Sequence, residues 1–451
     1  MPGKVTLRVT AGPLNGRSFE FDSHDTFLFG RSPDCHAELA ESDTTASRHH
    51  FLLEVNPPAA RLRDLGSLNG THVNGVRYGG RGRHQAPERA RPSGQAEIDL
   101  QDGDHIRVGH TEFRVSVDAP AACCECGRAI PAEDRFASAW VAGTFLCTAC
   151  RAKGVGFAAL PPPAPQPAPP PARPAAHGAP EVEGYDLLRP LAKGGMGVVY
   201  LARRQADGTT VALKILLPRT LVDPSAREIF QREIDVTRSL RHPNIVQLLD
   251  HGAAGESFYF AMEYCSGGSV RAVLKARTKP FAVEDALDLA RQALAGLAHA
   301  HERGFVHRDL KPENLLLGGD AGQVKIADFG LAKSFEQAGW SGLTATGAVA
   351  GTLFFMPREQ LTNFRVVRPV SDVWSMGATI YFLLTRQYAR DFRQGQDPLP
   401  LILGGGVVPL RVRDPRIPEG VARVVDCALS DDPDDRYPSA AEFLNDLERS
   451  A

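Results

Sequence analysis

The chain has 451 residues, of which 43% are hydrophobic and 23% charged, the balance of an ordinary soluble globular protein with two or three domains. Its formal net charge of −2 gives no electrostatic reason to expect nucleic acid as the main partner. No apolar run approaches the ~20 residues that a membrane span needs, and the N-terminal residues lack the apolar block of a signal peptide. We therefore expect a cytoplasmic protein with neither a nucleic-acid nor a membrane partner.

Residues 1–118 read as a succession of short strands separated by turn residues. The runs VTLRVT, FLFGRS, HHFLLEV, HIRVG and EFRVSV are typical of strands, and no convincing helix interrupts them. This pattern predicts an all-β sandwich. Residues 77–97 are rich in arginine, and we interpret them as a solvated loop insertion.

Five motifs follow one another in this region: FGRS (29–32), SRHH (47–50), GSLNGT (66–71), VNG (73–75) and GDHIRVG (103–109). Glycine and asparagine tolerate tight turns, and exposed loops on a rigid sheet often serve recognition. In this order the motifs resemble the forkhead-associated (FHA) domain, a module that recognises phosphothreonine peptides.

The resemblance implies a phosphopeptide site with a role for each of four side chains. Arg31 is expected to give a charge-assisted hydrogen bond to the phosphate, with Arg48 as a second positive charge. Ser47 is expected to donate from its hydroxyl, and Asn69 to hold the peptide backbone. His50 is expected to brace the loop from within.

One position departs from the family pattern, because Leu68 stands where many FHA domains have threonine. One hydrogen bond to the phosphate would then be missing, which bears on affinity more than on the existence of the site. The alternative is a sandwich that only packs against the rest of the chain.

Five of the eight cysteines cluster between residues 123 and 150. Two CxxC pairs, separated by about twenty residues, suit a tetrahedral Zn²⁺ site, with the ligands Cys123, Cys126, Cys147 and Cys150. Residues 119–155 are too few to form a core of their own, so we expect structural zinc and a resemblance to a zinc ribbon. The alternatives are buried free thiols or a redox pair.

Residues 156–182 include PPPAPQPAPPPARPAAHGAP, which cannot form a helix or a central strand. We expect an extended, semi-rigid linker, with docking to an aromatic groove as the alternative. The chain then changes character. Strands with one helix are predicted to about residue 264, and mainly helices from residue 282 onward.

The segments HRDLKPENLLL and VKIADFGLA carry side chains suited to phosphoryl transfer, which needs positioning and charge neutralisation more than covalent chemistry. Asp309 could accept the proton of an attacking hydroxyl, and Lys311 could lie against the transferred phosphate. Asn314 and Asp328 could hold Mg²⁺.

Two upstream segments complete this set. VALK places Lys214 on a predicted strand, and Glu233 on the following predicted helix is its expected ion-pair partner. The turn AKGGMGVVY allows close approach of phosphates through Gly194, Gly195 and Gly197.

In this order the motifs resemble the Hanks-type serine/threonine protein kinases over about residues 183–450, and the sequence GGMGVVYLA resembles that of the bacterial members. The resemblance implies an α+β two-lobed fold, ATP with Mg²⁺ or Mn²⁺ as cofactors, and serine or threonine hydroxyls of proteins as acceptors. It assigns Asp309 as the base, with Lys214 and Glu233 on the nucleotide phosphates. It also implies an adenine pocket at Val199, Ala212, Glu263 and Cys265, beside Met262.

Two positions depart from the kinase pattern. Ala192 replaces the usual first glycine of the nucleotide loop, which costs flexibility. The segment that normally reads Ala-Pro-Glu is PRE, so Arg358 stands where the family has proline. Glu359 remains, and Arg436 matches its expected partner. The alternative function is a pseudokinase that binds nucleotide and partners without chemistry.

The resemblance also implies how activity is switched. An arginine at position 308 pairs in the family with a phosphate on the activation segment, for which Thr344 and Thr346 are the expected acceptors. We expect autophosphorylation, with a transient dimer for reaction in trans, and an FHA domain that reads phosphothreonine on the chain itself or on substrates.

Overall fold

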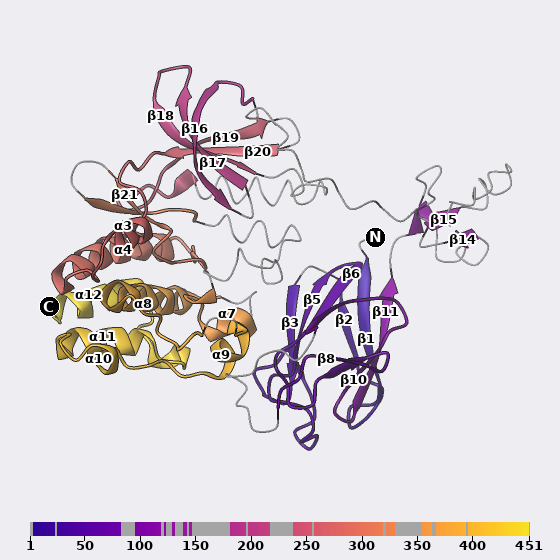
Figure 1. Cartoon of the computed structure of the whole chain (residues 1–451). Coiled ribbons are helices and arrows are strands. Elements are labelled where there is room, and N and C mark those ends of the chain that lie inside the picture. The colour runs from indigo at the N-terminus through magenta and orange to yellow at the C-terminus, as the bar shows by residue number, and fades with distance from the viewer. Residues whose placement is uncertain are drawn as a thin grey trace.

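The computed structural model describes the chain in several stretches (Figure 1). These are residues 3–22, 25–82, 95–118, 181–194, 197–216, 238–254, 257–318, 322–329, 353–362, 367–393 and 396–450, together with four short strands between 121 and 146. Within these stretches no helix is long and apolar enough to cross a membrane.

The N-terminal part is a sandwich of two sheets, with strand orders β2-β1-β11-β10-β7-β8 and β4-β3-β5-β6-β9. The first sheet contains β1 (Lys4–Ala11), β2 (Ser18–Phe21), β7 (Thr71–Val73), β8 (Val76–Tyr78), β10 (His105–Val108) and β11 (Thr111–Asp118). The second contains β3 (Asp25–Gly30), β4 (Ala37–Glu38), β5 (Phe51–Asn56), β6 (Ala59–Asp64) and β9 (Glu97–Leu100).

The core of the sandwich follows from the alternation of its strands, in which every second side chain faces the opposite sheet. Phe29 on β3 stacks on Phe51 of β5 with ring centroids 4.4 Å apart, and Phe113 from the other sheet meets Phe29 edge-on at 5.9 Å. In the stretches described, residues 3–118 contain strands and turns and no helix. The expectation of an all-β sandwich is thus confirmed.

Two small hairpins follow the sandwich. Strand β12 (Ala121–Ala122) pairs with β13 (Ala129–Ile130), and β14 (Ala139–Val141) pairs with β15 (Thr144–Leu146). The four cysteines of the predicted zinc site and almost all of the proline-rich segment lie outside the described residues.

A separate antiparallel sheet of five strands forms a small lobe, with strand order β16-β17-β18-β20-β19. Its strands are β16 (Tyr185–Gly194), β17 (Gly197–Arg204), β18 (Thr210–Leu216), β19 (Leu248–Ala254) and β20 (Ser257–Glu263). Gly197 is required here by packing, because a Cβ at this position would lie 2.2 Å from the carbonyl oxygen of Ile215.

The remaining described residues form a large, mainly helical lobe in which α4, α11 and α12 contact the central helix α8 (Figure 1). Nearly every side chain of α8 is buried, with Trp374 at 0% exposure, which explains its continuous apolar sequence. The elements are α3 (Val270–Ala276), α4 (Val283–Glu302), β21 (Leu315–Gly318), β22 (Gln323–Ile326), α7 (Arg358–Thr362), α8 (Pro369–Thr385), α9 (Pro398–Gly404), α10 (Leu410–Arg413), α11 (Glu419–Ala428), a 3-10 helix (Pro433–Asp435) and α12 (Ala440–Arg449).

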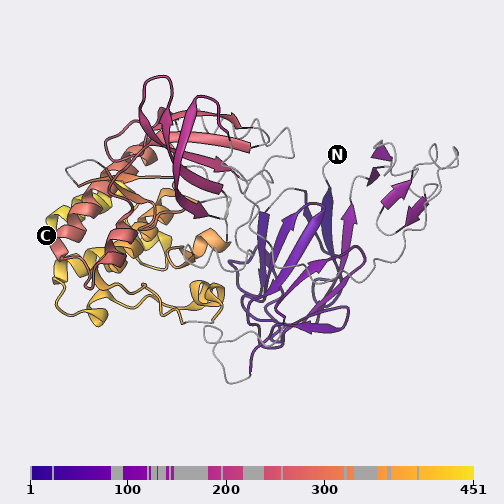
Figure 2. The ribbon, with the colours of Figure 1, turned by 45° about the horizontal axis from the view of Figure 1, so that its top comes forward.

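The sandwich lies beside the large lobe, on the side that carries α7 and α9 (Figures 1 and 2). Apolar side chains from both parts form one buried cluster at this junction. Residues from opposite ends of the chain are therefore packed together.

Candidate functional site

Asp309 lies between α4 and β21, and two side chains of its own segment converge on it. The Nζ of Lys311 donates to both carboxylate oxygens of Asp309 at 2.8 Å. The Nδ2 of Asn314 donates to the Asp309 carbonyl oxygen at 2.7 Å and to its Oδ2 at 3.1 Å. The result is a fixed carboxylate with a positive charge beside it, suited to taking a proton from a hydroxyl.

A second carboxylate lies close by, at the end of β22. The Nζ of Lys214 on β18 donates to Oδ1 of Asp328 at 2.8 Å, which joins the two lobes. Burial raises the pKa of Asp328, but the charge and hydrogen bond of Lys214 outweigh it, so the pKa lies below its ordinary value. Asp328 is therefore ionised at neutral pH.

Asn314 and Asp328 are held near one another by the backbone, since the amide of Ala327 donates to the Asn314 carbonyl oxygen at 2.8 Å. A carboxylate and an amide oxygen are the hard ligands that Mg²⁺ and Mn²⁺ accept. The donor set thus fits the predicted divalent cation. Lys214, on the other side of Asp328, fits an anionic ligand such as a phosphate.

Asp372 on α8 positions the turn that precedes Asp309, and it was not singled out from the sequence. Its carboxylate is fully buried and accepts from the amides of His307 at 2.7 Å and Arg308 at 2.8 Å, and from the His301 ring at 2.9 Å. Arg308 has the left-handed backbone, with φ 70°, that is costly for a residue with a side chain. The two amide bonds from one carboxylate hold this turn in place.

The electrostatics of Asp372 agree with that role. Burial raises its pKa, but the hydrogen bond and charge of His301, together with His307, outweigh burial and bring the pKa below its ordinary value. The available signal was a single acidic residue inside the apolar run SDVWSMGATIYFLLT, where an unpaired charge would be costly.

Val199, Ala212 and Glu263, three of the residues expected around adenine, lie on strands of the small-lobe sheet. In the sheet register Val199 is opposite Lys214, and Ala212 is opposite Met262. The Glu263 side chain forms an ion pair with Lys325 at 3.0 Å, so its carboxylate is already engaged.

Cys265 follows β20 as a buried free thiol, and burial raises its pKa to about 11. It is therefore an unreactive side chain that supplies shape.

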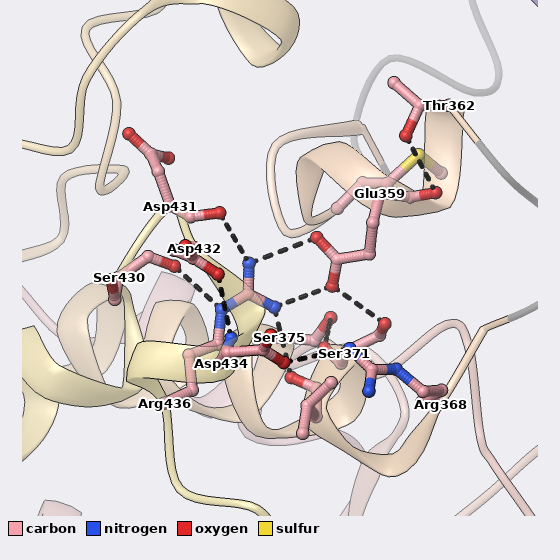
Figure 3. A network of polar contacts seen from close by, with 12 residues as sticks. Glu359, Thr362, Arg368, Ser371, Ser375, Ser430, Asp431, Asp432, Asp434 and Arg436 are labelled. Carbon is pink, nitrogen blue, oxygen red and sulfur yellow. Dashed lines mark hydrogen bonds and ion pairs between the residues drawn. The ribbon is translucent and has the colours of Figure 1, made fainter. Parts of the chain in front are cut away.

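Glu359 and Arg436 form the ion pair expected from the sequence, which is thereby confirmed (Figure 3). The Nη1 of Arg436 lies 2.6 Å from Oε1 of Glu359, and Nη2 lies 3.1 Å from Oε2. Ser371 donates to Oε1 as well, at 2.8 Å. The altered motif PRE thus keeps the link between α7 and the C-terminal part of the lobe.

The neighbours of Glu359 on α7 bind two further parts of the molecule. The Nε2 of Gln360 donates to the Arg308 carbonyl oxygen at 2.6 Å, one residue before Asp309. Arg358 forms an ion pair with Asp34 of the sandwich. Three consecutive side chains therefore connect α7 to the segment that carries Asp309, to the C-terminal part of the lobe and to the sandwich.

Three of the predicted phosphopeptide residues meet where two loops of the sandwich come together. The Nδ2 of Asn69 donates to the Thr45 carbonyl oxygen at 2.8 Å, and the Ser47 hydroxyl accepts from the Leu68 amide at 3.0 Å. Arg31 donates through Nε to the Ala46 carbonyl oxygen at 2.7 Å. Arg48 is exposed nearby.

His50 and Asp64 support these loops from the interior. The Nδ1 of His50 accepts from the Ser47 amide at 2.9 Å, as expected of a bracing residue. Burial lowers the pKa of His50, so the ring is neutral. Asp64, which the sequence did not single out, accepts from the hydroxyls of Ser67 at 2.7 Å and Thr71 at 2.8 Å.

Several predicted site residues lie outside the described residues, so their roles stay predictions. They are Gly195, Glu233, Thr344, Thr346, Cys123, Cys126, Cys147 and Cys150. Gly194 is described as the last residue of β16.

Comparisons with known proteins agree with this geometry. A family model described as a protein kinase domain matches residues 185–446, and one described as an FHA domain matches residues 27–109. The tyrosine-protein kinase MasK of Myxococcus xanthus is 34% identical over 284 residues, which covers 58% of this chain and 42% of that protein.

Two relatives named as serine/threonine-protein kinases match to a similar extent. PknJ of Mycobacterium tuberculosis is 34% identical over 269 residues, covering 58% of this chain and 44% of that protein. PrkC of Bacillus subtilis is 30% identical over 263 residues, covering 58% and 40%. The chain thus spans less than half the length of each of these three relatives.

Proposed function

This chain belongs to the protein kinase family, and we propose that it transfers the γ-phosphoryl group of ATP to serine and threonine hydroxyls of proteins. The observation that carries the proposal is the cluster of Asp309, Lys311 and Asn314 beside the Lys214–Asp328 ion pair. The cluster brings together a base, an anion-binding cation and two oxygen ligands.

In the proposed reaction the acceptor oxygen forms a bond to the γ-phosphorus while the bond from that phosphorus to the bridging oxygen of ADP breaks. Asp309 takes the proton of the hydroxyl, and Lys311 balances negative charge on the transferred group. Lys214 would hold the nucleotide phosphates. Asn314 and Asp328 would hold Mg²⁺ or Mn²⁺, which neutralises phosphate charge when bound.

The choice of serine and threonine over tyrosine rests on KPEN, where Lys311 is bound to both oxygens of Asp309. Mapping of phosphorylated residues after incubation with ATP and Mg²⁺ tests this choice directly. Phosphotyrosine as the main product would contradict it. Asp309→Asn serves as the inactive control, because asparagine keeps the shape and loses the base.

The pseudokinase alternative predicts nucleotide binding without transfer. No described residue favours it, since Lys214, Asp309, Asn314 and Asp328 form one connected site. Nucleotide binding by the unmutated chain, with no phosphate found on itself or on a generic basic protein, would favour the alternative.

We further propose that the sandwich reads phosphothreonine through Arg31, Ser47, Arg48 and Asn69. Ser47 accepts one hydrogen bond from a backbone amide, which leaves its own proton for a phosphate oxygen. The bonds from Arg31 to the carbonyl oxygens of Ala46 and Glu41 use two of its five N–H groups and orient the guanidinium. Calorimetry with matched phosphorylated and plain peptides tests this part.

A structural zinc ion at Cys123, Cys126, Cys147 and Cys150 belongs to the same proposal. It is supported by the two hairpins, because the first cysteine pair lies between β12 and β13 and the second follows β15. The free thiols Cys35 and Cys265 support the proposal that the protein is located in a reducing compartment such as the cytoplasm.

A further inference from the structure

The outer face of one sandwich sheet is apolar, and the large lobe covers it. Leu28 on β3 and Leu52 on β5 alternate with residues that fill the sandwich core, so they point away from it. Together with Cys35 and Leu65 they form one cluster with residues of the large lobe. The lobe contributes Leu353, Met356, Leu361, Leu399, Ile402 and Leu403, all at most 8% exposed. We call this junction the docked face.

Two ion pairs flank the docked face, one with its cation on the large lobe and one with its cation on the sandwich. Arg358 of the large lobe binds Asp34 of the sandwich, and Arg63 of the sandwich binds Asp397 of the lobe at 2.9 Å. Asp34 is also held by the His49 ring at 3.0 Å. An apolar centre with complementary charges at its edge is the composition of a specific protein–protein interface.

The docked face lies next to the catalytic segment. Gln360 on α7 donates to the Arg308 carbonyl oxygen, one residue from Asp309, while Leu361 of the same helix is buried in the docked face. The sandwich is therefore joined through α7 to the segment that carries Asp309. A protein chain that presents a hydroxyl to Asp309 extends on both sides of the acceptor residue, so a domain held beside this segment would compete with it for space.

We propose that the docked face is an autoinhibitory contact, in which the chain's own sandwich covers the substrate side of its kinase domain. The proposal rests on the proposed kinase activity and concerns the regulation of that same site. It also accounts for the departure at position 358, because the arginine found there is the residue that binds the sandwich. Protein substrates compete with the sandwich, so a chain with a weakened docked face phosphorylates them faster.

The test uses the full-length chain and two independent measurements. Docking is followed by alkylation of Cys35 with iodoacetamide, quantified by peptide mass spectrometry. Burial raises the pKa of this thiol to about 12, so it reacts slowly while docked. Cys265, a buried thiol of the small lobe, is the reference within the same chain. Activity is followed as initial rate of phosphate transfer to a histone preparation.

Arg358→Glu reverses the charge opposite Asp34 on a half-exposed residue, and the double variant with Asp34→Arg restores an attractive pair. Arg61→Glu is the matched control, since Arg61 forms an ion pair within the sandwich, with Asp99, on the same strand as Arg63. Leu52→Asp is a second route that removes apolar contact without touching the sandwich core.

We expect Arg358→Glu and Leu52→Asp to speed Cys35 alkylation and histone phosphorylation roughly tenfold, the change that ~1.4 kcal/mol of lost docking free energy produces. The double variant with Asp34→Arg should reverse the rise in histone phosphorylation caused by Arg358→Glu, and Arg61→Glu should leave both rates unchanged. Faster alkylation with unchanged or slower phosphorylation would overturn the inhibitory role. Unchanged alkylation in both variants would overturn the docking itself. If neither the unmutated chain nor any variant transfers phosphate, the proposed kinase activity and its regulation are both wrong. The alkylation rate of Cys35 then still shows whether the sandwich docks on the large lobe.

Discussion

Replacing Arg436 by methionine is expected to lower the free energy of unfolding of the kinase domain by about 3 kcal/mol. The Arg436 side chain is 0% exposed. It donates to both oxygens of Glu359 and to the carbonyl oxygens of Ser430 at 2.7 Å and of Val370 and Asp431 at 3.2 Å (Figure 3). Methionine fills much of the volume and satisfies none of these acceptors.

The magnitude follows from what is left behind. Breaking a buried ion pair by removing one partner costs about 3–5 kcal/mol, because the other charge stays uncompensated. The lower end applies here, since the Glu359 side chain is 22% exposed and still accepts from Ser371. For a domain of this size about 3 kcal/mol corresponds to a fall in Tm of roughly 6–12 °C.

Scanning calorimetry of the full chain measures this change as a shift of the kinase transition. Arg368→Met is the matched control, because Arg368 is 56% exposed and lies 3.5 Å from Asp434. Exposed pairs of this kind contribute at most about 1 kcal/mol. A shift for Arg436→Met no larger than that of the control would refute the reasoning from burial.

Four further predictions concern the other sites. Asp372→Asn should lower the rate of phosphate transfer with little change in ATP affinity, because it weakens the hydrogen bonds that hold the turn at His307 and Arg308, next to Asp309. The pKa of Asp372 is lower in the folded chain than in the unfolded chain, so its carboxylate stabilises the fold above about pH 4, the unfolded pKa. This stabilisation is lost only as the pH falls through the folded pKa, and acid unfolding of the unmutated chain and of Asp372→Asn would show the difference. Elemental analysis should find about one zinc ion per chain, and Cys147→Ser should lose it without stopping the kinase. Replacing Thr344 and Thr346 with alanine should depress activity in a histone assay, whereas unchanged activity would mean that no activating phosphate is needed there. Arg31→Ala should abolish binding of a phosphothreonine peptide that the unmutated chain binds with micromolar affinity, near −8 kcal/mol, by calorimetry.

The clustering of the candidate kinase-site residues was predictable because they lie in short segments. Asp309, Lys311 and Asn314 are within six positions of one another, so their order in the sequence already implied a shared site. The strands of the sandwich were likewise predictable from alternation, which depends only on neighbouring residues.

The partners of Asp372 and Asp64 could not be found in this way, because they become apparent only once the chain has folded. Asp372 binds the His307 amide across 65 positions, and nothing near it in sequence indicates that partner. Arg358 was noticed only as a departure from a motif. Its partner Asp34 lies 324 positions away, so its role depends entirely on tertiary structure.

The docked face and the predicted phosphopeptide site share one stretch of backbone. Asp34 and Cys35 face the large lobe, whereas Arg31 and Ser47, in the same segment between β3 and β5, belong to the predicted phosphopeptide site. The two sites are joined directly, since the amide of Ser32 donates to the Arg48 carbonyl oxygen at 3.0 Å and Cys35 donates to the same oxygen at 3.4 Å. Coupling between two binding events is reciprocal. A phosphopeptide that binds the undocked sandwich more tightly than the docked one therefore weakens docking by the ratio of the two affinities. Because Arg358→Glu weakens docking, it should raise the affinity of the full-length chain for that peptide.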